Sequence, residues 1–477
     1  MISKKMRFMH KFFATLVSFF VISSFAAVWL LFYNNFAFRT HWTEGAVISI
    51  IIYSIIYIAI AQLYRGFKIG TYPLGEVIFS QILALGIANA LLFAQCCLIS
   101  NKYVSIVPGL ITSLFQILCV VIWAAVVKRY YIHFTKPSDT LLICNHEHEG
   151  HSFKKMLGKK FSHFFKISRI ETASTPLGTI QQKIDQSEAV ILYELDAVLR
   201  EQLMSHIIKH KKLLYVTPTV SDILMHGFEN RHFVDTPLMK YEYAYEKPIS
   251  YLGKRAIDLL FSILGLAVFS PFMFIFALFI KLEDGGPVLY KQKRCTKDGK
   301  VFEILKFRSM VVNAEENGTV IPCVANDSRI TRVGKVIRKF RIDETPQIFN
   351  VLKNDMSIVG PRPERVEHMK EYCKKHPEFT YRLRVKGGLT GYAQIYGRYN
   401  TDAYDKLRLD MMYIENMSML LDLKLIILTI KTIFISESTE AFTKEQSHYI
   451  TRSEKASKFN KNVGEKAGEN QFERKIV

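Results

Sequence analysis

Four long apolar runs occupy the N-terminal part of the chain, near residues 12–32, 46–63, 72–99 and 106–127. Each run is long enough to cross about 30 Å of hydrocarbon as a helix. Clusters of lysine and arginine precede the first run and follow the second and the fourth. Because positively charged loops of this kind stay in the cytoplasm, the pattern predicts four transmembrane helices and places those loops on the cytoplasmic side.

Shorter runs follow, and they alternate between strand-like and helical periodicity. Strand-like runs lie at 140–144, 189–195 and 212–218, and helical patterns lie at 178–187, 198–209 and 221–227. This alternation predicts a small α/β layer with parallel strands. The turn after the first strand reads NHEHEGH, with one glycine. A dinucleotide site needs a glycine-rich turn there, so we expect a degenerate Rossmann-like domain without a bound cofactor.

That turn contains three histidines, His146, His148 and His151. A metal site is one interpretation, but the spacing of the possible ligands is loose. We therefore interpret the turn as a solvated polar loop.

A fifth apolar run covers residues 257–280 and contains Ser270-Pro271 past its middle. Proline removes one backbone donor and clashes with the preceding turn, so we expect a bend there. The hydroxyl of Ser270 can satisfy the carbonyl that the proline sets free. A helix that enters the bilayer, breaks at these two residues and returns would keep both basic flanks in the cytoplasm. We expect such a re-entrant helix, with an ordinary kinked span as the alternative.

The remainder of the chain is more polar. Residues 281–417 are basic and of mixed pattern, whereas residues 418–434 are apolar with Asp422, Lys424 and Lys431 interspersed. The second pattern predicts a helix that lies at the membrane interface. The last residues are charged and without periodicity, which is typical of a disordered tail. The sequence thus predicts a membrane protein of mixed α and α/β class, with a four-helix transmembrane region at 1–132, a cytoplasmic α/β domain at 133–248, a domain with the re-entrant helix at 249–436 and a tail at 437–477.

Composition narrows the class of partner. The 477 residues carry a formal net charge of +20, which favours anionic partners such as nucleic acid, phospholipid head groups or phosphorylated substrates. However, 49% of the chain is hydrophobic, which suits a membrane protein better than a nucleic-acid binder. The seven cysteines are scattered without a C-x-x-C pair, so we expect neither a disulfide framework nor a zinc site. A lipid bilayer is therefore an expected partner, and nucleic acid is not.

Two adjacent acids, Asp343 and Glu344, stand in the basic stretch GKVIRKFRIDETPQIFN at residues 334–350; we refer to them as the acid pair. The simplest interpretation is helix capping, because Thr345 is a good N-cap, Pro346 fits the first helical position and a helix N-terminus stabilises acids. The neighbourhood favours a further role. The cations within fifteen residues upstream are Arg329, Arg332, Lys335, Arg338, Lys339 and Arg341.

Other charged residues add to this motif. Arg362 lies in a Gly-Pro-Arg-Pro turn, whose prolines limit the backbone freedom that a phosphate-binding guanidinium would lose. The segment VFEILKFRSM at 301–310 predicts either a strand that delivers Lys306 and Arg308 to one edge or an exposed strand with a solvated face. Carboxylates among cations can hold Mg²⁺ or attack phosphorus, and a helix start beyond them can help to bind phosphate. Asp410, taken alone, is interpreted as an ordinary surface charge.

Five motifs then occur in a fixed order: KRAIDLLFSILGLAVFSP, KFRSM, RIDETPQIFNVLKNDMSIVGPRPE, GLTGYAQIYGR and LRLDMMYIENMSMLLDLKLI. Over about residues 250–435 they resemble the bacterial sugar transferase domain of the monotopic polyprenyl-phosphate phosphoglycosyl transferases. The N-terminal region resembles that of the long members, typified by undecaprenyl-phosphate galactose or glucose phosphotransferases. The resemblance implies an enzyme at the cytoplasmic face of the bacterial inner membrane. It would transfer a hexose 1-phosphate from a UDP-sugar to undecaprenyl phosphate and start the repeat unit of an exopolysaccharide, capsule or O-antigen.

The resemblance also implies roles for individual residues. Asp343 would be the nucleophile, forming a covalent aspartyl intermediate as UMP leaves, and would contact a Mg²⁺ cofactor. Glu344 would be its partner acid, and Asp410 matches a functionally required acid. Ser270 and Pro271 match the break in the re-entrant helix of the family.

Cations complete the expected site. Arg338 and Arg362 match family positions that are associated with substrate phosphate. Lys306 and Arg308 join them as candidate phosphate ligands because of their strand-end position.

The chain departs from the family pattern in two places. Thr345 replaces the usual leucine after Asp-Glu, a change that should not disturb the acids. The usual R-P-G-[IV]-T-G becomes KGGLTG at residues 386–391, so the Arg-Pro is lost and the preferred sugar donor is left open.

Two other classes remain as alternatives. A membrane-bound nucleotide-sugar dehydratase can also follow four spans with an α/β domain, although the glycine-poor turn argues against it. A non-catalytic scaffold of glycan assembly would use the acid pair only to cap a helix. Whether the protein forms a homodimer is left open.

Overall fold

The computed structural model describes residues 4–33, 43–69, 72–101, 103–134, 137–161, 164–233, 236–241, 248–312, 314, 327–397 and 401–433. The expected tail at 437–477 lies outside these described residues. The chain divides into two compact units, Met1–Thr217 and Pro218–Val477.

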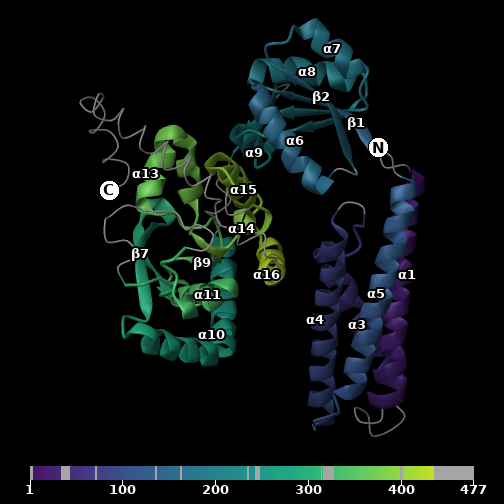
Figure 1. Cartoon of the computed structure of the whole chain (residues 1–477), viewed down its shortest axis with the longest axis vertical. Coiled ribbons are helices and arrows are strands. Elements are labelled where there is room, and N and C mark those ends of the chain that lie inside the picture. The colour runs from purple at the N-terminus through teal and green to yellow at the C-terminus, as the bar shows by residue number, and fades with distance from the viewer. Residues whose placement is uncertain are drawn as a thin grey trace. The chain divides into compact units, whose positions relative to one another are not determined.

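The apolar runs of the N-terminal unit form long helices (Figure 1). They are α1 (Lys4–Val28), α3 (Thr43–Leu63), α4 (Leu74–Ser100) and α5 (Val107–Phe134), and a π-helical turn, η1 (Trp29–Tyr33), continues α1. In this bundle α4 packs against α3 and α5, and α1 packs against α5. Together with a helix of the second unit, they are long and apolar enough to cross a membrane. The four N-terminal apolar runs thus form helices of spanning length, whereas their expected arrangement as four transmembrane helices stays a prediction.

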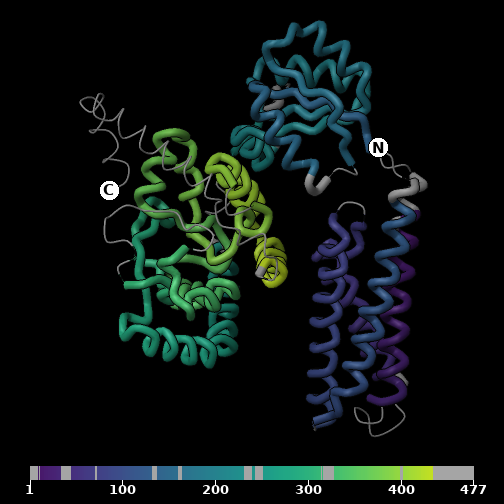
Figure 2. The backbone as a smooth tube through the Cα atoms, in the orientation of Figure 1, coloured from purple at the N-terminus to yellow at the C-terminus, as the bar shows by residue number. Residues whose placement is uncertain are grey.

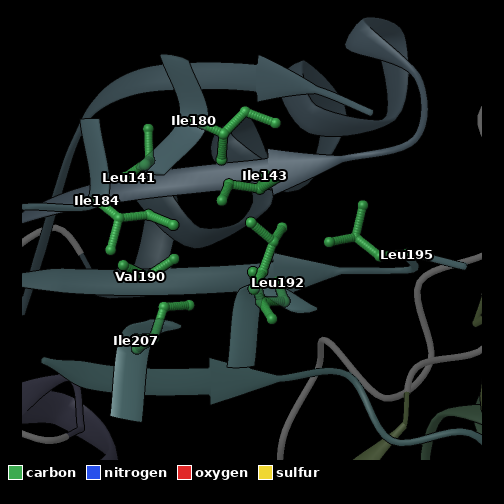
Figure 3. Packing of buried hydrophobic residues seen from close by; sticks show 9 residues of the cluster. Leu141, Ile143, Ile180, Ile184, Val190, Leu192, Leu195 and Ile207 are labelled. Atoms are coloured by element: carbon green, nitrogen blue, oxygen red, sulfur yellow. The ribbon is translucent and has the colours of Figure 1, made fainter. Parts of the chain in front are cut away.

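A parallel sheet follows the bundle in the chain. Its strands are β1 (Ser138–Cys144), β2 (Phe165–Thr172), β3 (Ala189–Tyr193) and β4 (Leu213–Val216), in the order β2-β1-β3-β4. The connecting helices are α6 (Glu147–Phe161), α7 (Leu177–Asp185) and α8 (Ala197–Lys209). Buried aliphatic side chains of β1, β3, α7 and α8 form its core, among them Leu141, Ile184 and Ile207 (Figure 3). The predicted parallel layer is confirmed. Strand β2 was missed because charged residues interrupt its few apolar ones and it buries only Ile167.

The histidine-containing turn after β1 is shorter than predicted. Helix α6 begins at Glu147, so His148 and His151 lie on a helix rather than in a loop. Their side chains are exposed, as is that of His146. The histidines are therefore solvated, as expected, but the loop assignment is wrong for two of them.

The second unit consists of one long helix and many short elements, and Figure 2 traces the path of the chain through them. In chain order they are α9 (Val220–Met225), β5 (Glu229–Phe233), β6 (Thr236–Lys240), α10 (Pro248–Asp284), β7 (Leu289–Cys295), η3 (Lys297–Gly299), β8 (Val301–Phe307), α11 (Arg332–Lys339), η4 (Ile342–Glu344), α12 (Gln347–Leu352), β9 (Ser357–Val359), α13 (Val366–Lys375), η5 (Pro377–Arg384), β10 (Gly388–Thr390), α14 (Tyr392–Tyr396), α15 (Ala403–Glu415) and α16 (Met419–Ile433). Strands β5 and β6 pair antiparallel, as do β7 and β8, whereas β9 and β10 pair parallel. Helix α10 contacts α11, α12, β9 and α16.

Helix α10 bends sharply but does not end within the apolar run (Figure 1). Pro271 lies inside this helix of 37 residues, and it leaves the carbonyl of Ala267 without its helical donor. The hydroxyl of Ser270 lies 3.5 Å from that oxygen, at the long limit of a hydrogen bond. The expected bend is confirmed, whereas the expected break is instead a bend in one continuous helix.

Helix α16 confirms the helix predicted at 418–434, but its charges lie differently from the expectation. Asp422 is buried and pairs with Lys254 of α10, with 2.7 Å between Nζ and Oδ2. Leu420 and Leu423 are exposed instead. Leu425 and Leu428 are buried beside Asp422, so leucines lie on both the inner and the outer face of the helix, and the exposed ones suit contact with lipid.

Candidate active site

The acid pair lies in η4, a single 3₁₀ turn between α11 and α12. Arg341 precedes it with a left-handed backbone, at a φ of 55°. The expected N-cap at Thr345 is wrong, because this residue already has helical backbone angles and Pro346 holds the cap position of α12. The hydroxyl of Thr345 donates instead to the carbonyl oxygen of Ile342 at 2.8 Å. The 3₁₀ turn runs directly into α12, so no extended residue precedes the helix to act as its cap.

Glu344 is held by cations from three parts of the chain. Nη2 of Arg362 donates to its Oε1 at 2.5 Å, and Nζ of Lys306 lies 3.2 Å from the same oxygen. Nη1 of Arg341 lies 3.9 Å from Oε2. Burial acts to raise the pKa of Glu344, but Arg362 and Lys306 outweigh it and hold that pKa well below the usual value. Glu344 is therefore an ionised, fully engaged acid.

Asp343 differs from its neighbour in having both carboxylate oxygens uncommitted. It forms no hydrogen bond or ion pair with any residue that the structure describes. Burial and the negative charge of Glu344 raise its pKa from 3.8 to about 6. Lys306, Arg338 and Arg362 attract the ionised form, and they limit this rise. The site therefore presents one free carboxylate surrounded by cations.

Of the two predicted strand-end cations, one reaches the acid pair. Strand β8 ends at Phe307, so the alternation that would place Lys306 and Arg308 on one edge stops between them. Lys306 contacts Glu344. Arg308 is buried and pairs with Asp284 at the end of α10.

Asp410 is buried at 1% exposure, so its interpretation as a surface charge is wrong. Nη2 of Arg382 donates to Asp410 Oδ2 at 2.7 Å and to the backbone carbonyl oxygen of Arg362 at 2.9 Å. Burial raises the pKa of Asp410 to about 6, although Arg382 opposes this. Asp410 thus supports the segment from which Arg362 reaches Glu344. Its part in the reaction stays a prediction.

Sequence reasoning missed Arg294 and Arg382. Both donate to carbonyl oxygens of the Gly-Pro-Arg-Pro turn: Nη1 of Arg294 reaches that of Pro363 at 2.9 Å, and Arg382 reaches that of Arg362. Each buried carbonyl needs a donor, and arginine offers several donors in a fixed geometry. A buried proline-rich turn was therefore a signal that arginines from elsewhere in the chain would be needed.

The loop that departs from the family pattern lies against the same turn. A Cβ added to Gly388 would lie 2.1 Å from the backbone nitrogen of Gly360, and one added to Gly387 would lie 2.5 Å from Cγ of Pro363. Gly387 stands where the family pattern has proline. A ring at this position would require Pro363 to shift, and the glycine removes that conflict.

The acid pair offers a metal ion one free ligand. Mg²⁺ is commonly held by one or two carboxylates together with substrate phosphates and water. Asp343 can supply such a carboxylate, whereas the oxygens of Glu344 face Arg362 and Lys306. The donor set therefore fits one Mg²⁺ held by Asp343 and by the phosphate oxygens of a bound substrate.

Comparison with known proteins identifies relatives of the part of the chain that contains this site. The family described as bacterial sugar transferase matches residues 249–436. The chain is 45% identical over 189 residues to the UDP-N-acetylgalactosamine-undecaprenyl-phosphate N-acetylgalactosaminephosphotransferase of Aeromonas hydrophila, covering 39% of this chain and 44% of that protein. It is 39% identical over 202 residues to the UDP-glucose:undecaprenyl-phosphate glucose-1-phosphate transferase of Escherichia coli (strain K12), covering 41% of this chain and 43% of that protein.

A shorter relative shares almost its whole length. The uncharacterized sugar transferase EpsL of Bacillus subtilis (strain 168) is 37% identical over 198 residues, which cover 42% of this chain and 93% of that protein. The match spans less than half of the two longer relatives. Because the family and the short relative match the same part of the chain at substantial identity, the protein belongs to the bacterial sugar transferase family.

Proposed function

We propose that this protein is a phosphoglycosyl transferase of the bacterial inner membrane. It moves a hexose 1-phosphate from a UDP-sugar to undecaprenyl phosphate at the cytoplasmic face and so starts the repeat unit of an exopolysaccharide, capsule or O-antigen. The names of two relatives, both undecaprenyl-phosphate sugar phosphotransferases, support this reaction class.

The observation that carries the proposal is the contrast within the acid pair. Cations bind Glu344, whereas Asp343 has no hydrogen-bond or ion-pair partner among the described residues and a pKa of about 6. A carboxylate that attacks phosphorus must be ionised and uncommitted, and nearby cations must stabilise the charge that develops. Asp343 meets both requirements.

The proposed reaction has two steps. A carboxylate oxygen of Asp343 attacks the phosphorus that carries the sugar, the bond from that phosphorus to the bridging oxygen breaks, and UMP leaves with this oxygen. An oxygen of undecaprenyl phosphate then attacks the same phosphorus and breaks its bond to Asp343, which restores the carboxylate. Lys306 and Arg362 keep Glu344 in place and offer positive charge to the phosphates, as does Arg338 near Asp343. A bound Mg²⁺ supplies further charge neutralisation at the phosphate oxygens.

A donor panel tests this function. Purified full-length protein is incubated with Mg²⁺ and a set of UDP-hexoses labelled in the sugar, with and without undecaprenyl phosphate. We expect UMP release with at least one donor, and a covalent label on the protein when the acceptor is absent. A dehydratase would alter the sugar without releasing UMP, and a scaffold would do neither. Absence of UMP with every donor overturns the proposal.

The raised pKa of Asp343 predicts inhibition by acid. The ionised nucleophile dominates above a pH of about 6 and falls about tenfold per pH unit below it. Single-turnover UMP release should therefore decline along this slope as the pH is lowered. Asp410 also has a pKa of about 6, so the profile is repeated with Asp410→Asn, which should keep the same inflection. A rate that is constant down to a pH of about 5 argues against Asp343 as the nucleophile.

We also propose that α10 is re-entrant. Lys254 and Arg255 precede its apolar run and Lys281 follows it, which favours the cytoplasm at both ends. A topology reporter fused after residue 281 should report the cytoplasm, as should one fused after residue 130, whereas one fused after residue 103 should lie outside. If the reporter after residue 281 is found outside, α10 spans the membrane.

A further inference from the structure

Two histidines and an aspartate meet where α7 and α8 end, in the α/β part of the N-terminal unit. Asp185 is the last residue of α7, His206 lies in the last turn of α8, and His210 caps α8. One ligand atom from each lies within 4.8 Å of the others. The two helices pack together over the sheet (Figure 1). The packing of α7 against α8 therefore brings the acid to the two histidines, which are distant from it in the sequence.

The core fixes the positions of these residues. Ile184 precedes Asp185, Ile207 follows His206, and both isoleucines are fully buried in one core cluster (Figure 3). His206 and His210 are four residues apart, so both rings lie on one face of the α8 end. Their ring centroids are 4.2 Å apart.

One distance between ligand atoms is close to that of a tetrahedral metal site, and a second would have to shorten when an ion binds. Zinc bonds to nitrogen and oxygen are about 2.0–2.1 Å long, which places two ligand atoms about 3.3 Å apart. Oδ1 of Asp185 lies 3.1 Å from Nε2 of His206 and 3.9 Å from Nδ1 of His210. Nδ1 of His210 also lies 2.8 Å from the carbonyl oxygen of His206. It would exchange this hydrogen bond for the metal, or the ring would turn to present Nε2.

The surroundings leave the position open to an ion. The side chains of Asp185 and His210 are exposed at 46% and 39%, so an ion and a completing water can enter. Lys212 is a cation beside the site. Its Nζ is held by the backbone carbonyl oxygens of Asp185 and Ser187 at 2.7 and 2.8 Å, so the amine is occupied with backbone rather than with the carboxylate.

We propose that Asp185, His206 and His210 bind one divalent transition-metal ion of the zinc class, which joins the ends of α7 and α8. Imidazole ligands favour such ions over Mg²⁺, which prefers oxygen. This site therefore differs in both place and metal from the proposed Mg²⁺ position at Asp343. Without an ion, the same contact is only a hydrogen bond between a histidine and an acid.

Titration of purified full-length protein with ZnCl₂ tests the proposal. The protein is first freed of metal with a chelator and then kept in Mg²⁺, and binding is followed by calorimetry and by the midpoint of thermal unfolding. We expect one equivalent of Zn²⁺ to bind and the midpoint to rise with zinc concentration. Because loss of an outer-shell partner already costs about 10- to 100-fold in metal affinity, loss of a ligand in His206→Gln should cost at least about 100-fold.

Two further variants keep the test decisive. Asp185→Asn preserves the shape of the side chain and removes its charge, so it should fold even if His206→Gln does not, and it should also weaken zinc binding. His151→Gln removes an exposed histidine that pairs with Glu147 on α6, and it should bind zinc like the wild type. The absence of saturable binding, or equal affinity in wild type and Asp185→Asn, overturns the proposal.

Discussion

Asp343→Asn is expected to abolish both UMP release and covalent labelling while making the folded protein more stable. The amide has no charge with which to attack phosphorus, so we expect the rate to fall at least about a thousandfold, as is typical when a nucleophile is removed. The nearly isosteric side chain leaves the cations around Glu344 in place. The loss of activity should therefore come from the chemical step and not from a failure to fold.

The gain in stability follows from the sign of the pKa shift. The pKa of Asp343 is 3.8 in an unfolded chain and about 6 in the folded protein. The folded state thus favours the protonated form, and at neutral pH the ionised carboxylate is a cost that increases as the pH rises from about 4 to about 6. A difference of about 2 pKa units corresponds to about 3 kcal/mol, which is an upper bound for the gain on removing the charge.

UMP assays and thermal unfolding of the same preparations test both parts. Asp298→Asn serves as the matched control, because Asp298 is an exposed acid of the same domain whose left-handed backbone suits asparagine equally well. Asp298→Asn should change neither the rate of UMP release nor the midpoint of thermal unfolding. Turnover of Asp343→Asn at the wild-type rate would remove Asp343 as the nucleophile, and a lower unfolding midpoint would contradict the expected cost of its charge.

Lys254→Met is expected to destabilise the second unit strongly. Nζ of Lys254 donates to Oδ2 of Asp422 at 2.7 Å, to the hydroxyl of Tyr413 at 3.0 Å and to the carbonyl oxygen of Val359 at 2.9 Å. The side chains of Lys254 and Asp422 are only 8% and 5% exposed. Removing the cation leaves a buried carboxylate without its partner, which typically costs about 3–5 kcal/mol.

A double variant separates charge from packing. Lys254→Met combined with Asp422→Leu removes both charges and should recover much of the lost stability, because neutral side chains need no ion partner. Thermal unfolding in one detergent compares the single and double variants with the wild type. A single variant as stable as the wild type would show that Asp422 finds another partner or takes up a proton without cost.

Local sequence patterns sufficed for much of the fold. The apolar runs predicted the spanning-length helices, and Ser270-Pro271 predicted the bend in α10, because chain stiffness and proline chemistry act over a few residues. The acid pair was also identified from local residues. The residues next to it in the sequence, however, did not reveal that Glu344 would be paired with cations while Asp343 would keep its oxygens unpaired among the described residues.

The contacts that sequence reasoning missed are long-range. Asp422 looked like a polar interruption in an interfacial helix, but its partner Lys254 lies 168 positions away. Asp410 looked exposed because its partner, Arg382, belongs to a different element. In both cases the burial of a charge is decided by which distant segments pack together, and no periodicity encodes that pairing.

The contacts that hold the acid pair are all contained in one stretch of chain. Glu344, Lys306, Arg341, Arg362, Arg382 and Asp410 form one connected set, and each contact described for them joins residues of the second unit. Such a set can be inherited as a module. Evolution can exchange the preceding segment, or discard it as in the short relative, without rebuilding the chemistry. The N-terminal unit is then free to diverge toward regulation or localisation while the same site is retained.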